Sequence, residues 1–97
     1  MRLTAPTDFE ILQALSDGKR DNASNLSHTL DKNRSYINTR LPVLADYGLL
    51  ERVGPAPNSG LYVITEMGKV VADLEAEYAD DDVDFDALVE ERLDERD

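Results

Sequence analysis

The segment of residues 22–50 constrains the fold more than any other part of the chain, because it predicts two short helices joined by a tight turn. Asn22 is a good N-cap, since its side-chain oxygen can accept a hydrogen bond from the first turn of a helix. Leu26 and Leu30 follow one turn apart and define an inward face. Asp31 then stands in the turn, where aspartate tolerates the left-handed conformation less well than glycine but better than most residues.

The second helix of this segment is predicted to begin after Asn33, another good N-cap, and to end before Gly48. Its inward stripe has apolar side chains at i, i+4 and i+7, namely Ile37, Leu41 and Leu44. Pro42 lies inside this helix and has no N–H to donate, so we expect a kink or an early end of the regular helix there. The two helices and their turn have the outline of a helix-turn-helix.

The outward face of the second helix is polar. At 100° per residue, the side chains that point away from the stripe or lie at its flanks and edges are Arg34, Ser35, Tyr36, Asn38, Thr39 and Arg40. Such side chains are well suited to base edges and phosphate oxygens. They also occur on an ordinary solvated helix face, so the pattern alone leaves both interpretations open.

A β-hairpin is predicted after the second helix. Residues 49–53 and 61–65 are β-prone, and the glycines and prolines of residues 54–60 exclude a helix and favour a long loop. Helix, turn, helix and hairpin in this order are typical of a winged helix. We therefore expect an α+β, mostly α fold: a winged helix-turn-helix with a three-helix core, a two-stranded wing over residues 49–65, and an additional C-terminal helix or helices.

Over residues 7–77 the chain resembles the winged helix-turn-helix transcriptional regulators of haloarchaea, of the phage-repressor-like subfamily. The resemblance is most specific at residues 40–50. The segments on which it rests are residues 33–50, 54–57 and 64–68. It implies a small DNA-binding regulator with the helix of residues 34–47 in the major groove and the loop of residues 54–60 as the wing.

The expected DNA contacts lie on the second helix, just before it, and in the wing. They are Lys32, Asn33, Arg34, Ser35, Tyr36, Asn38, Thr39 and Arg40, followed by Arg52, Asn58 and Ser59. Lys19 and Arg20 are candidate backbone contacts, although exposed loop cations are at least as often simply solvated. For the hairpin tip, phosphate contact and a bare turn are equally good interpretations.

The formal net charge of −11 argues at first sight against a DNA partner, but the charge is unevenly distributed. Residues 1–65 contain seven basic and seven acidic side chains, whereas residues 66–97 contain fourteen acids and three bases. Five bases and two acids lie in residues 18–41, so this window is locally positive, as a phosphate-facing surface requires. Three lysines and seven arginines in so acidic a chain also fit a halophilic protein.

Apolar periodicity predicts helices on both sides of these motifs. The capping-box pattern of Thr7 and Glu10 predicts a helix that begins at Thr7 and ends at Gly18. Thr65 is expected to cap a later helix, part of whose apolar stripe covers the core while the rest is free to pair with a second subunit. That stripe contains Met67, Val70, Val71, Leu74 and Tyr78.

The acidic end of the chain also has an apolar stripe at helical spacing, formed by Phe85, Leu88, Val89 and Leu93. We therefore divide the chain into a DNA-binding domain, residues 1–78, and an acidic C-terminal segment, residues 79–97. This segment is either a frayed tail that keeps the protein soluble or a dimerisation or partner helix that hides Phe85 and Leu88. We favour the helix, because disordered tails seldom keep an apolar stripe in register.

Composition excludes several kinds of function. The chain has no cysteine, no nucleophile and base pair, and no metal-ligand constellation, so we expect no catalytic residues, no cofactor, no metal and no enzyme. It has no apolar run of membrane-span or signal-peptide length, so we expect a cytoplasmic protein without a membrane partner.

The leading hypothesis is a sequence-specific regulator that binds double-stranded DNA as a homodimer. The alternative is a winged-helix adaptor that binds a protein partner through residues 79–97. A pull-down repeated after nuclease treatment separates the two, because only a protein partner would persist.

Overall fold

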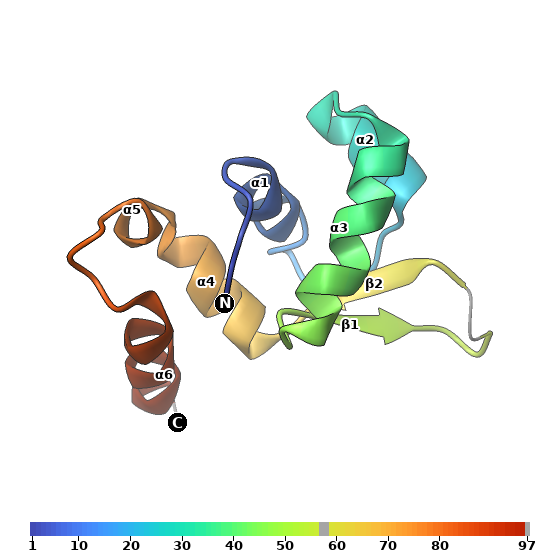
Figure 1. The fold of residues 1–97 in the computed structure, drawn as a ribbon. Coiled ribbons are helices and arrows are strands. Elements are labelled where there is room, and N and C mark those ends of the chain that lie inside the picture. The colour runs from blue at the N-terminus through green and yellow to red at the C-terminus, as the bar shows by residue number, and fades with distance from the viewer. Residues whose placement is uncertain (57–58, 97) are drawn as a thin grey trace.

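The computed structural model describes residues 1–56 and 59–96, which form six helices and one two-stranded sheet. The elements are α1 (Thr7–Ala14), α2 (Ala23–Leu30), α3 (Arg34–Asp46), β1 (Leu50–Val53), β2 (Leu61–Ile64), α4 (Glu66–Asp73), α5 (Glu75–Tyr78) and α6 (Phe85–Glu95). Helix α1 lies between two groups, with α2, α3 and the hairpin on one side and α4, α5 and α6 on the other (Figure 1). The mostly helical α+β fold predicted from the sequence is confirmed.

Local hydrogen bonds begin and end the helices of the helix-turn-helix as predicted. The Asn22 side chain accepts a hydrogen bond of 2.9 Å from the backbone N–H of residue 25, and the Asn33 side chain accepts one of 3.0 Å from that of Tyr36. Asp31 has a left-handed φ of 53°, and Gly48, just past the end of α3, has a φ of 83°. The residues that enforce this motif all lie within it.

Helix α3 continues through Pro42 and ends at Asp46, so the expectation of an early end is wrong. Proline removes one hydrogen bond from the helix interior. Leu41 and Leu44, on either side of it, are completely buried. Burial of this apolar face holds the last turns of α3 on the core despite the missing hydrogen bond.

The hairpin is antiparallel, with Leu50 opposite Ile64 and Val53 opposite Leu61. Asp21 extends it across the open edge of β2, because its backbone exchanges hydrogen bonds of 2.8 and 3.0 Å with that of Tyr62. The start of α2 is thereby fixed beside the hairpin.

Helix α1 differs from the prediction at both ends. Its N-cap is Pro6 without a side-chain hydrogen bond, so Thr7 does not form a capping box, and the helix ends at Ala14 rather than Gly18. Instead, the Asp8 carboxylate accepts a hydrogen bond of 2.7 Å from the backbone N–H of Thr4. Thr7 and Asp8 are both buried, and burial directs their polar groups to partners from other parts of the fold.

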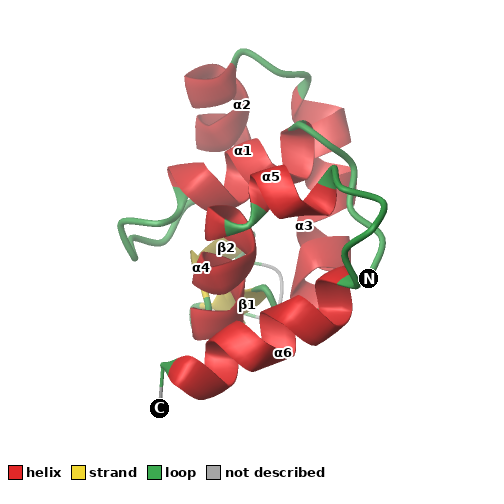
Figure 2. Cartoon of the chain, turned by 90° about the vertical axis from the view of Figure 1, so that its left-hand side faces the viewer, coloured by secondary structure: helices red, strands yellow, loops and turns green. Residues whose placement is uncertain are grey.

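The acidic C-terminal segment is part of the same core. Asp84 caps α6 through a hydrogen bond of 3.2 Å from the backbone N–H of Ala87. Phe85 is 9% exposed and Val89 is completely buried, and α6 packs on α4 of its own chain (Figure 2). The tail interpretation therefore does not describe residues 84–96, and Phe85 is covered by its own chain rather than left for a partner.

An aromatic cluster joins the two ends of the chain. The Tyr78 ring lies 5.4 Å from that of Phe9 on α1 and 4.9 Å, edge on, from that of Phe85 on α6. The Tyr78 hydroxyl donates to the carbonyl of Leu3 at 3.0 Å and accepts from its N–H at 2.8 Å. The helix predicted after Thr65 is divided at Leu74 into α4 and α5, and Tyr78 is the last residue of α5.

Replacing Gly68 with alanine should destabilise the protein by about 1–3 kcal/mol, the usual cost of overpacking. Helix propensity alone predicts the opposite sign, a gain of about 1 kcal/mol. However, an added Cβ would overlap the carbonyl oxygen of Leu49 and lie 2.7 Å from Cγ1 of Ile64. Urea unfolding checks the sign, with Lys69→Ala at the next position as the control that should change stability by less than about 0.5 kcal/mol.

Candidate nucleic-acid interface

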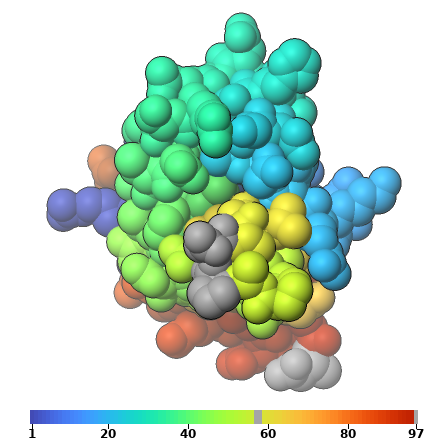
Figure 3. Space-filling view, turned by 90° about the vertical axis from the view of Figure 1, so that its right-hand side faces the viewer, coloured from blue at the N-terminus to red at the C-terminus, as the bar shows by residue number. Residues whose placement is uncertain are grey.

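An open groove of about 330 Å³ lies between the start of α2, the first half of α3 and the end of the hairpin loop. Its lining residues are Asn22, Ala23, Ser24, Arg34, Asn38, Ser59 and Gly60. None of them is acidic. Figure 3 views the molecule from this side, with α2 and α3 above the hairpin.

The first half of α3 presents the polar face that the sequence predicts. Arg34, Ser35, Tyr36, Asn38 and Thr39 are all exposed, while the apolar stripe of the helix is buried. Among the described residues, Tyr36 is the large hydrophobic side chain left exposed, at 38%. The Thr39 hydroxyl donates to the Tyr36 carbonyl at 2.6 Å, so it already has one partner within the helix.

Arg40 faces α1 rather than the outward side. Its Nε and Nη2 donate hydrogen bonds of 2.9 and 2.8 Å to the two carboxylate oxygens of Asp8. The Asp8 side chain is 0% exposed and that of Arg40 only 17%. These hydrogen bonds raise the pKa of the Arg40 guanidinium above its ordinary value, so the guanidinium stays charged.

Lys32, in the turn before α3, also points toward α1. Its Nζ lies 3.0 Å from Oε1 of Glu10 and 3.3 Å from the hydroxyl of Thr7. Asn33 is exposed, but its side-chain oxygen caps α3. Two of the cations expected to contact DNA, Lys32 and Arg40, therefore have carboxylate partners inside the fold.

The wing residues have partners within the hairpin. The exposed Arg52 donates from Nε to the Tyr62 hydroxyl at 3.0 Å, and its guanidinium carbon lies 5.7 Å from the centre of the Tyr62 ring. The Ser59 hydroxyl donates to the carbonyl of Val53 at 2.6 Å. Asn58 lies outside the described residues.

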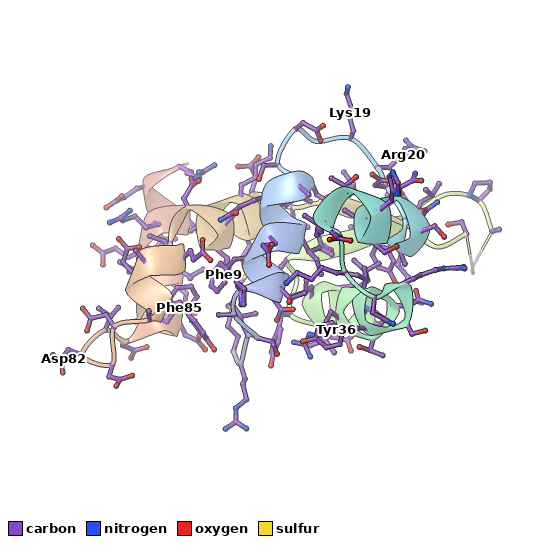
Figure 4. All side chains as sticks on the ribbon, turned by 90° about the horizontal axis from the view of Figure 1, so that it is seen from above. Phe9, Lys19, Arg20, Tyr36, Asp82 and Phe85 are labelled. Atoms are coloured by element: carbon purple, nitrogen blue, oxygen red, sulfur yellow. The ribbon has the colours of Figure 1, made fainter. Side chains whose placement is uncertain are left out.

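Arg34 on α3 lines the groove, and two further cations, Lys19 and Arg20, lie on the loop before α2. All three are exposed and make no ion pair within residues 1–56 and 59–96. Figure 4 shows Lys19 pointing away from the ribbon. The acidic helix α6 lies on the other side of α1, and in Figure 3 the red C-terminal end of the chain lies along the lower edge, not over α2 and α3.

Sequence reasoning missed Asn22 and Ser24 as groove residues. They reach the groove because the backbone of Asp21 pairs with that of Tyr62, which is distant in the sequence. This pairing brings the start of α2 beside the hairpin. A single pair of backbone hydrogen bonds between distant segments leaves no periodic pattern in a sequence. Asn22 had a local role as an N-cap, and that role gave no indication of a second one.

Within the part of the chain that the structure describes, no three acidic, histidine or cysteine side chains are grouped closely enough to hold a metal ion. None of the described helices has the length and apolar character needed to cross a membrane.

No protein-family model matches the chain, and no curated protein matches it. Among solved structures, that of a MarR family protein from Bacillus stearothermophilus is similar to the structure of this chain. The two are 18% identical, with a TM-score of 0.62 over 98% of this chain and 73% of the other. At this identity the likeness concerns the fold, which is a winged helix with additional C-terminal helices.

Proposed function

We propose that this winged-helix chain is a sequence-specific DNA-binding transcriptional regulator, with α3 as the recognition helix in the major groove and the β1–β2 hairpin as the wing. The observation that carries the proposal is the groove between α2, α3 and the hairpin. It is polar, contains Arg34, and has no carboxylate among its lining residues although the chain has a net charge of −11. A groove with no acid among its lining residues, in so acidic a protein, fits an anionic partner.

The groove residues also have the hydrogen-bonding groups that base reading needs. Asn38 can make a bidentate contact with adenine, and Arg34 can make one with guanine or bind a phosphate. Lys19 and Arg20, on the adjacent loop, are candidates for phosphate contacts that fix the register of the complex. The likeness in fold to a MarR family protein supports this reading of the architecture.

We further propose that a homodimer reads two half-sites, as the symmetry of many helix-turn-helix operators requires. Of the two side chains expected to be covered by a partner, Phe85 is buried in its own chain, whereas Leu88 is half-buried and remains available for a dimer contact. A footprint with two inverted half-sites would support the dimer, and a single unrepeated site would contradict it.

The test is selection of bound fragments from sheared genomic DNA, followed by gel-shift titration of the enriched sequence. Arg34→Ala should weaken binding about 10- to 100-fold, because one base or phosphate contact is lost. The matched control is Arg92→Ala, which removes the same charge from α6 on the far side of the molecule and should leave affinity unchanged. Failure to enrich any DNA would refute the proposal and favour the protein-binding adaptor.

A further inference from the structure

The Asp8 carboxylate is the most deeply buried charged group of the described chain, and both of its oxygens accept hydrogen bonds. Arg40 donates two hydrogen bonds to it from α3, and the backbone N–H of Thr4 donates a third. A buried carboxylate is stable only when it is paired and hydrogen-bonded. The bidentate geometry also fixes direction, because a planar guanidinium meets a carboxylate in one orientation. The pair therefore sets both the distance and the rotation of α3 relative to α1.

A second attachment holds the other end of the same segment. Lys32 contacts Glu10 and Thr7, which lie on α1 beside Asp8. The two attachments are at residues 32 and 40, and the segment between them contains the two α3 side chains that line the groove, Arg34 and Asn38, together with the exposed Ser35, Tyr36 and Thr39. Three side chains from the first half of α1 thus hold the outward-facing part of the helix-turn-helix at both of its ends.

Resting on the DNA-binding function proposed above, we infer that Asp8 and Arg40 are positioning residues, which present the 33–39 segment to DNA without touching it. Arg40 is unsuited to a phosphate contact, because reaching one would leave the Asp8 carboxylate buried without its partner. The pair acts instead by fixing α3 before DNA arrives, which lowers the ordering cost of binding. The contribution of Arg40 to affinity is then independent of the number of phosphates contacted.

Salt dependence separates a positioning residue from a contact residue. Each phosphate that a cation neutralises adds about 0.9 to the slope of log affinity against log salt for duplex DNA. The experiment measures that slope for the full chain with Arg40→Lys, Arg40→Met and Asp8→Asn, using the DNA enriched above. Arg34→Ala is the contact reference, and Arg92→Met is the control for loss of one positive charge away from the interface.

We expect Arg40→Lys and Arg40→Met to weaken binding by a similar factor, about tenfold, because lysine keeps the charge but loses the bidentate geometry. The slope should equal that of the wild type in both, whereas Arg34→Ala should lower it by about 1. Asp8→Asn combined with Arg40→Met should bind no more weakly than Arg40→Met alone, since both changes break the same pair. Circular dichroism confirms that each variant is folded at the assay temperature, and the salt slope of Arg40→Met, which removes the charge, decides the question if Asp8→Asn does not fold.

Two results would overturn the inference while leaving the proposed function intact. One is an Arg40→Lys variant with wild-type affinity beside an Arg40→Met variant with a reduced slope, which would make Arg40 a phosphate contact. The other is wild-type affinity in all three variants while Arg34→Ala binds weakly. If the wild-type chain binds no DNA selectively, the proposed function and the positioning role are both refuted.

Discussion

Replacing Val89 with aspartate should destabilise the protein by roughly 4 kcal/mol or more, a large part of the 5–15 kcal/mol typical of a domain. Val89 is 0% exposed in the core, α6 packs on α4, and a carboxylate placed at this position would be transferred from water into an apolar environment. The measurement is urea unfolding followed by circular dichroism at neutral pH. The urea concentration at the midpoint should fall sharply, because the packing of α6 on α4 stabilises the whole domain and not the C-terminal helix alone.

Ala87→Asp is the matched control for that experiment. It adds the same charge to the same helix, but Ala87 is exposed and lies in the first turn of α6, where an acidic side chain is favourable. We expect its stability to change by less than about 0.5 kcal/mol. Equal effects of the two substitutions would mean that α6 is not packed on the core in solution.

Phe9→Ala should cost about 3–5 kcal/mol, as expected for removal of a buried aromatic side chain. Phe9 is 0% exposed and its ring packs against that of Tyr78, which in turn packs against that of Phe85. The cavity would open where α1 meets the C-terminal helices. Thermal and urea unfolding measure the loss, and a reduced folding cooperativity would show that α6 separates first.

Phe9→Leu tests whether the loss comes from the cavity. Leucine fills most of the space and keeps the apolar contact, so it should cost about 1.5 kcal/mol or less. A loss as large as that of the alanine variant would instead assign the effect to the aromatic contact with Tyr78. A small loss in both variants would contradict the packing of this cluster.

Much of the fold could be predicted from the sequence because its determinants are local. Asn22 and Asn33 cap helices through bonds to residues three positions away, and Gly48 supplies the left-handed conformation after α3. The hairpin follows from two β-prone runs around a loop rich in glycine and proline, and the exposed polar face of α3 follows from the position of its buried stripe. Each of these depends on a few neighbouring residues.

The side-chain orientations and helix contacts that could not be predicted depend on segments that are distant in the sequence but adjacent in the fold. Arg40 lies at the edge of the α3 stripe, and from that position its side chain could turn outward or toward α1. The buried carboxylate of Asp8 decides the direction, and Glu10 does the same for Lys32. The apolar stripe of α6 was visible in the sequence, but not that its partner would be α4 of the same chain.

The sequence by itself determined the helix-turn-helix, the hairpin and the outward polar face, since backbone hydrogen bonding and apolar periodicity act over one or two turns. Only the tertiary structure decided which cations remain available at the surface, where α6 is buried, and why Gly68 has no room for a side chain beside Leu49. The physical reason is that a buried charge or an apolar face is stable only against a complementary group. That group is supplied by elements far away in the chain.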